Sequence, residues 1–145
     1  MINYNTVQKI YSRNYGSIGL YKRPFFNQLV YTDGVMDFQR TLNAYWIVDN
    51  TISYMPEILK TFKESEDTFY VVEISVNKER QGYMEVYREG YIGNDYNEHI
   101  TVIKQDIPFI DLPVKTDDEI TTYKFHLTLS NYGLPQFMLM LPSEY

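Results

Sequence analysis

Residues 32–49 read TDGVMDFQRTLNAYWIVD, in which apolar side chains recur about every 3.6 residues. This spacing predicts an amphipathic helix whose apolar stripe packs on the core. Thr32 or Asp33 is expected to cap the helix N-terminus, because a side-chain oxygen at that position accepts hydrogen bonds from free backbone N–H groups. The stretch therefore fixes both the start of the helix and the side that faces the rest of the molecule.

The helix is expected to end near Tyr54. The next two residues are Met55 and Pro56, and a residue before proline is pushed out of the α region. A short second helix, residues 57–63, is expected to follow. Residues 32–63 therefore form the predicted helical part of the chain.

One acidic residue interrupts the apolar stripe. Placing the residues at about 100° intervals puts Asp49 near the centre of the stripe. The apolar neighbours there include Val35, Phe38, Leu42 and Trp46. A buried carboxylate must be hydrogen-bonded or paired with a cation. Asp49 is then either a structural pin for the N-terminal segment or a general base or ligand in a pocket, and the structural role is favoured because most buried polar groups are simply satisfied.

From Thr68 onward the hydrophobic residues recur with a period of two, which is typical of half-buried β-strands. The strands are expected around residues 70–76, 83–88, 100–102, 123–129 and 137–141. Short turns join consecutive strands, so residues 68–141 predict an antiparallel sheet of about five strands with the main helix on one face. The predicted fold class is α+β.

The chain has 145 residues, a length that fits a single domain. Its formal charge is −6, and the charges are unevenly distributed. Residues 1–31 are aromatic and carry four cations but no acid, whereas 15 of the 19 acids lie between Glu57 and Glu119. The N-terminal segment mixes aromatic and basic residues in a way that suits single-stranded nucleic acid. The acidic remainder disfavours direct nucleic-acid binding and binding to an anionic membrane.

The chain contains no cysteine and no stretch apolar enough for a signal peptide or a membrane span. Disulfides and thiolate metal sites are thereby excluded. We expect a cytoplasmic protein of a bacterial host.

Catalytic signatures are missing from the sequence. It contains no phosphate-binding loop, dinucleotide fingerprint, GxSxG elbow or HExxH motif. A metal site rich in histidine would need both histidines, His99 and His126, together with carboxylates. We therefore predict no catalytic residue, no metal and no cofactor.

The candidate binding surface is acidic and aromatic. Tyrosine offers a large, rigid contact area with a polar tip, and the chain has 15 of them. Acidic groups suit a basic partner, although such runs are more often solvated surface. The candidate residues are Glu64, Glu66, Asp67, Glu73, Glu85, Tyr87, Asp117, Asp118 and Glu119.

Three sequence blocks resemble a family of small, uncharacterised bacterial and phage proteins that carry a domain of unknown function. The blocks are Tyr31-Thr32-Asp33-Gly34, Ala44-Tyr45-Trp46-Ile47-Val48-Asp49 and Leu141-Pro142-Ser143-Glu144-Tyr145. The resemblance implies that Asp33, Asp49 and the terminal Glu144-Tyr145 hold the fold. It also implies a mobile-element protein that inhibits host defence.

Three functional hypotheses follow. The first is a non-enzymatic inhibitor that binds a larger basic protein, most concretely an anti-CRISPR protein that blocks an RNA-guided nuclease complex. The second is an enzyme or small-ligand binder with a pocket around Asp49. The third is a homo-oligomeric accessory protein that pairs through an exposed edge strand.

Overall fold

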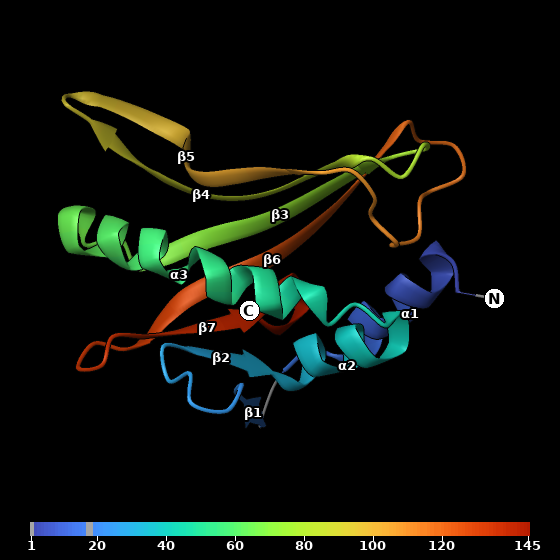
Figure 1. Ribbon diagram of the computed structural model, residues 1–145, viewed down its shortest axis with the longest axis horizontal. Coiled ribbons are helices and arrows are strands. Elements are labelled where there is room, and N and C mark those ends of the chain that lie inside the picture. Colours follow the sequence, from blue (N-terminus) through green and yellow to red (C-terminus); the bar gives the residue numbers. More distant parts are fainter. Residues whose placement is uncertain (1, 17–18) are drawn as a thin grey trace.

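The computed structural model describes residues 2–16 and 19–145. In these residues it contains three α-helices, a seven-stranded sheet and a terminal 3₁₀ helix (Figure 1). The helices are α1 (Tyr4–Arg13), α2 (Asp33–Leu42), α3 (Trp46–Ser65) and η1 (Pro142–Glu144). The strands are β1 (Leu20–Tyr21), β2 (Leu29–Thr32), β3 (Phe69–Asn77), β4 (Gly82–Ile92), β5 (Asp95–Ile107), β6 (Ile120–Asn131) and β7 (Gln136–Met140).

The predicted α+β class is confirmed, but the sheet is larger than the predicted five strands and is mixed. Its strand order is β1-β2-β7-β6-β3-β4-β5, and β2 pairs with β7 in parallel. The sequence pattern missed β2 because all four of its residues are buried, so the strand lacks the alternation that marks a half-buried strand. The N-terminal segment thus contributes two strands to the sheet, and residues 1, 17 and 18 of that segment lie outside the described residues.

The predicted single helix is in fact two helices. Asn43 adopts a left-handed conformation with φ 52° and ends α2. Asparagine tolerates this conformation better than most residues do. The N–H of Ala44 then donates to the carbonyl of Gln39 at 2.9 Å, which closes the helix end. The helical phase counted from Val35 therefore does not continue into α3.

The predicted helix end near Tyr54 is wrong, because α3 continues through Pro56 and includes residues 57–63, which were predicted to form a separate helix. A proline in a helix interior costs about 3 kcal/mol. Tyr54, Met55 and Ile58 are 3%, 0% and 0% exposed, and burying each such side chain contributes about 1.5–3 kcal/mol. Packing on the sheet therefore outweighs the proline, whose own side chain faces solvent.

The main core lies between the helices and one face of the sheet. The inward residues of β3 and β6 alternate as predicted, and they are Tyr70, Val72, Ile74, Val76, Tyr123, Phe125 and Leu127. Phe38 of α2 meets Tyr123 and Phe125 edge to face at 5.9 and 5.2 Å between ring centroids. Within the described ranges, no helix combines the length and apolarity needed to cross a bilayer.

Candidate functional site

The sheet face opposite the core carries a row of alternating charges. The strand registers place Lys124, Glu73, Glu85 and Lys104 side by side across β6, β3, β4 and β5. Glu73 and Glu85 are directly opposite each other, an arrangement of like charges that destabilises a sheet unless other groups compensate. We call these four residues the charged row.

Donors from neighbouring strands compensate both carboxylates. Glu85 is only 4% exposed and accepts from Thr101 Oγ1 at 2.5 Å, while His99 Nε2 lies 2.8 Å from the same oxygen. Glu73 accepts from the Tyr83 hydroxyl at 2.9 Å. The buried carboxylate of Glu85 is therefore already paired with side chains of the neighbouring strand β5 and stabilises the sheet.

Cations and aromatic rings complete this face. The Lys104 ammonium lies 4.1 Å from the centre of the Tyr83 ring, and the Lys124 ammonium lies 3.9 Å from Glu73. Tyr87 stacks on His99 with ring centroids 3.9 Å apart. Of the predicted binding residues, Glu73, Glu85 and Tyr87 share this face, and Tyr87 and Glu73 are the ones that keep some exposure.

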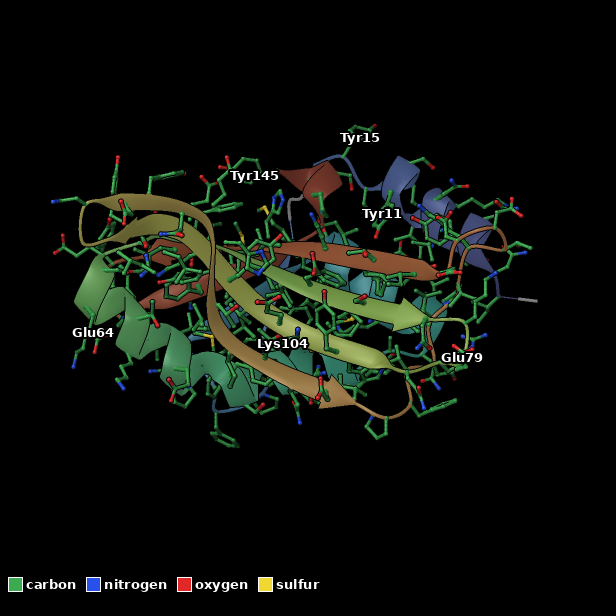
Figure 2. The ribbon with its side chains drawn as sticks, turned by 90° about the horizontal axis from the view of Figure 1, so that it is seen from above. Tyr11, Tyr15, Glu64, Glu79, Lys104 and Tyr145 are labelled. Atoms are coloured by element: carbon green, nitrogen blue, oxygen red, sulfur yellow. The ribbon has the colours of Figure 1, made fainter. Side chains whose placement is uncertain are left out.

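The other predicted acidic residues lie in two separate groups. Glu64 lies in the last turn of α3, and Glu66 and Asp67 follow that helix, beside the start of β3. Asp117–Glu119 precede β6, whose first residue pairs with the last residue of β3. Nine strand residues span roughly 30 Å, so the two groups lie at opposite ends of the sheet. Figure 2 shows this separation through Glu64 at one end and Glu79, beside the second group, at the other.

A two-stranded arm projects near the first acidic group. The pairing of β3 with β4 ends at Val71 and Tyr87, so residues 88–92 of β4 and 95–100 of β5 extend without a third strand (Figure 1). Tyr91, Ile92 and Tyr96 near the tip are 67%, 61% and 51% exposed. Glu89, Asp95 and Glu98 flank them. We call residues 88–100 the arm.

The base of the arm is hollowed. A pocket of about 410 Å³ is lined by Phe69, Val71, Tyr87, Arg88, Glu89 and Glu98. Arg88 forms an ion pair with Asp67 across this region. The predicted strands at residues 83–88 and 100–102 stop short of the arm, where the structure pairs Tyr91 with Tyr96 and Ile92 with Asp95.

Asp49 does not lie on the buried stripe. Its side chain is 62% exposed, because the break at Asn43 resets the helical phase and α3 buries Ile47, Val48 and Thr51 instead. The carboxylate contacts Arg23 Nε at 3.1 Å. This exposed position removes the argument for a general base in an apolar pocket.

Arg23 connects the N-terminal segment to both α2 and α3. Besides Asp49, its guanidinium donates to the Tyr31 hydroxyl at 2.8 Å and to Gln39 Oε1 at 3.2 Å. Asp33, the other predicted pin, accepts from the Gly19 N–H at 2.9 Å and from the Tyr21 hydroxyl. The pKa of Tyr21 is raised because its hydroxyl donates to that carboxylate. Both aspartates therefore contact the N-terminal segment.

The C-terminal block meets the N-terminal end of α2. Glu144 accepts from Thr32 Oγ1 at 2.6 Å, from the Leu141 N–H at 2.9 Å and from the Gly34 N–H at 3.1 Å. A Cβ atom on Gly34 would lie 2.3 Å from a Glu144 oxygen, so any larger residue there would displace the carboxylate. We call these contacts the Glu144 clamp, and they join two of the three sequence blocks in space.

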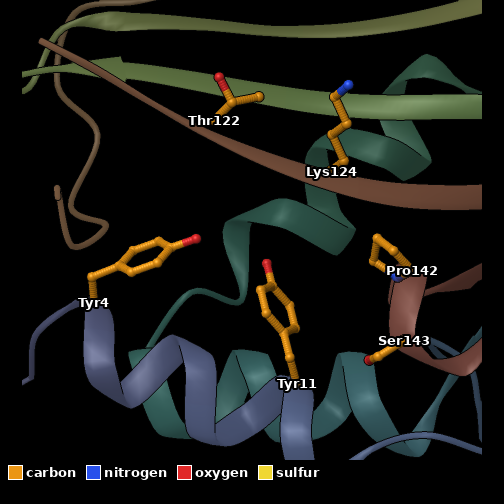
Figure 3. Close-up of a pocket in the computed structure, with 6 residues that line it drawn as sticks. All are labelled: Tyr4, Tyr11, Thr122, Lys124, Pro142 and Ser143. Atoms are coloured by element: carbon orange, nitrogen blue, oxygen red, sulfur yellow. The ribbon is translucent and has the colours of Figure 1, made fainter. Parts of the chain in front are cut away.

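A second pocket lies between α1, β6 and η1. It has a volume of about 350 Å³ and is lined by Tyr4, Tyr11, Thr122, Lys124, Pro142 and Ser143 (Figure 3). The Ser143 hydroxyl is buried and makes no hydrogen bond within the described part of the chain. Burial raises the pKa of Tyr11, so its hydroxyl stays protonated. Within residues 2–16 and 19–145, no three potential metal ligands cluster.

The fold and these surfaces define a small α+β protein with a mixed sheet, a paired polar face and an exposed acidic arm. The sequence matches a family of unknown function, DUF6876, over residues 5–145, and the chain belongs to this family. Comparison with curated proteins finds no match, and neither does comparison with solved structures. Membership confirms the resemblance to an uncharacterised family.

Proposed function

We propose that this chain is a non-enzymatic protein-binding protein that engages a basic surface of a larger partner through its arm. The observation that carries the proposal is the exposure of Tyr91, Ile92 and Tyr96 together at the tip. The rings of Tyr91 and Tyr96 meet edge to face at 5.3 Å, so they form one contact surface. Exposed apolar patches with polar rims are typical of interaction sites, and tyrosine is enriched there.

The charge around the arm selects the kind of partner. Glu89, Asp95 and Glu98 lie on the arm, and Glu64 and Glu66 lie close by at the end of α3. Such a potential attracts basic proteins and speeds their association. By contrast, two cations of the N-terminal segment are already in ion pairs, Arg13 with Asp37 and Arg23 with Asp49, which leaves less positive charge for a nucleic acid.

The most specific form of the proposal is an inhibitor of host defence, namely an anti-CRISPR protein that blocks an RNA-guided nuclease complex. The motive is the resemblance to mobile-element proteins together with the acidic arm. The alternative of a ligand pocket around Asp49 loses support, because that side chain is exposed and paired with Arg23.

The proposal is tested by affinity purification with mass spectrometry from bacteria that carry candidate defence systems. The test variant replaces Tyr91, Ile92 and Tyr96 with serine. The matched control is Tyr15→Ser, since Tyr15 is 83% exposed and lies far along the chain from the arm. We expect a basic partner that is recovered with the native chain and the control but lost with the arm variant.

A phage-challenge assay tests the specific form. Expression of the native chain should reduce interference, and the arm variant should restore it. Equal recovery of every partner by the arm variant would contradict the role of the arm. Unchanged interference with the native chain would contradict the anti-CRISPR form alone.

A further inference from the structure

We propose that two copies of this chain form a homodimer in which their β5 strands pair antiparallel about a two-fold axis at Thr101. The proposal concerns the backbone edge of β5. It goes beyond the proposed function and does not rest on it.

The first observation is a long strand with a neighbour on one side only. β5 has 13 residues and ends the strand order, with β4 as its neighbour. In Figure 1 it runs along the upper margin of the molecule, with no other element above it. A row of backbone N–H and C=O groups without a neighbouring strand is a template for pairing with another chain.

The second observation is that three pairs of β5 residues are complementary when the strand faces a second copy of itself. When Thr101 faces Thr101 of a second copy, Glu98 faces Lys104, Asn97 faces Gln105 and Ile100 faces Val102. Each of these three pairs occurs twice in the dimer, because the axis repeats it. Opposite charges and apolar pairs at facing positions stabilise an antiparallel pair. The register shifts of β5 against β4 fall at Val102 and at residues 98–99, one on each side of the axis, so each half of the interface contains one from either copy.

The third observation is the missing support of the arm. A two-stranded ribbon is at best marginally stable in water, and three or more strands are needed for independent stability. In the proposed register, residues 95–100 of one arm pair with residues 102–107 of the second copy. Each arm thereby becomes part of a continuous sheet.

The dimer leaves Tyr91 and Ile92 of the proposed partner-binding surface accessible, because they belong to β4 and do not lie on the β5 edge. Tyr96 lies on β5 and faces Asp106 of the second copy in this register. The axis places the two tips at opposite ends of the interface. A dimer would therefore present two arms to a partner, which raises avidity without new contacts.

Charge reversal tests the register. Glu98→Lys and Lys104→Glu should each weaken dimerisation about tenfold or more, because each converts two attractive pairs into two repulsive ones. The first variant carries lysine at both positions 98 and 104, and the second carries glutamate at both. In an equimolar mixture every facing charge pair of a heterodimer is attractive again, so the mixture should form that heterodimer. Sedimentation velocity from about 1 µM to about 1 mM, the range of moderate to weak affinities, measures all of these equilibria.

A cysteine reporter tests the axis independently of the charge-reversal variants. The native chain has no cysteine, so a single Thr101→Cys substitution gives one thiol per chain. Facing residues of an antiparallel pair have Cα atoms about 4.5–5.5 Å apart, which suits a disulfide. The matched control is Asp106→Cys on the same strand, whose two copies would lie about 33 Å apart. We expect efficient cross-linking at position 101 and only background at position 106.

Two results would overturn the proposal. The first is a native chain that remains monomeric up to about 1 mM. The second is cross-linking at position 101 no greater than at position 106. If Lys104→Glu fails to fold because it adds a carboxylate beside Glu85, the cysteine pair still decides.

Discussion

The Glu144 clamp makes a quantitative prediction about Gly34. Replacing Gly34 with alanine would place a Cβ atom 2.3 Å from Glu144 Oε1 and 2.8 Å from Oε2, so the carboxylate must leave its position. Gly34→Ala should therefore break the same hydrogen bonds as Glu144→Ala. The two substitutions act on one set of contacts, and their effects should not add.

The magnitude follows from the hydrogen bonds. Hydrogen bonds to a charged group contribute about 1.5–3 kcal/mol each, and the partial exposure of Glu144 reduces this, so we take about 3 kcal/mol for the three bonds together. Glu144→Ala should then lower the free energy of unfolding by about 3 kcal/mol. Gly34→Ala should lower it by about 2 kcal/mol, because alanine favours the helix by roughly 0.5–1 kcal/mol over glycine.

The double variant distinguishes this account from simple additivity. Without the carboxylate, alanine at position 34 retains only its helix-stabilising effect, so the double variant should be about 0.5–1 kcal/mol more stable than Glu144→Ala alone. Urea unfolding of the four proteins measures this cycle. Gly16→Ala is the control, since no heavy atom lies within 4 Å of its added Cβ. Additive losses of about 5 kcal/mol in the double variant would refute the reasoning.

Three further predictions concern single side chains. Arg13 donates to Asp37 and holds the pKa of that carboxyl below its usual value. The stabilisation that the ionised carboxylate gives to the folded state is therefore present above about pH 4 and is lost as pH falls through the folded pKa. Asp37→Asn should lower the free energy of unfolding, measured in urea, by about 1–2 kcal/mol at pH 7 and by much less at pH 3. Burial, with a smaller effect of Lys124, lowers the pKa of His126. The folded state therefore favours the neutral ring, and stability is lost as pH falls below about 6.5, where the ring of the unfolded chain becomes protonated. His126→Phe should reduce the loss of stability between about pH 7 and pH 5. Glu66 ends α3 with φ 61°, so Glu66→Gly should raise the melting temperature by roughly 2–4 °C, and a decrease would contradict the strain argument.

The sequence predicted those elements whose pattern is local. The alternation of residues 70–76 and 123–129 defines β3 and β6, and the same parity places Glu73 and Tyr87 on the face away from the helices. The helix cap at Thr32 was also readable, because its side chain accepts from the Val35 N–H only three residues away. Each of these features depends on neighbours within a few positions along the chain.

Other features could not be predicted from local patterns. β2 pairs in parallel with β7, more than 100 residues away, and its four buried residues show no alternation. The proline in α3 is tolerated because the sheet buries residues on both sides of it. Asp49 is exposed because one left-handed residue, Asn43, changes the phase of the following helix.

The sequence by itself therefore determined the class of the fold, the central strands and the side of the sheet on which each of their side chains lies, since these follow from the period of two along a strand. The tertiary structure alone decided which residues meet. It brought Glu144 to Thr32 and Gly34, paired Arg23 with Asp49, separated the two acidic groups and left the β5 edge exposed. These contacts join segments far apart in the chain, and their energies come from packing and pairing across the whole core rather than from any local preference.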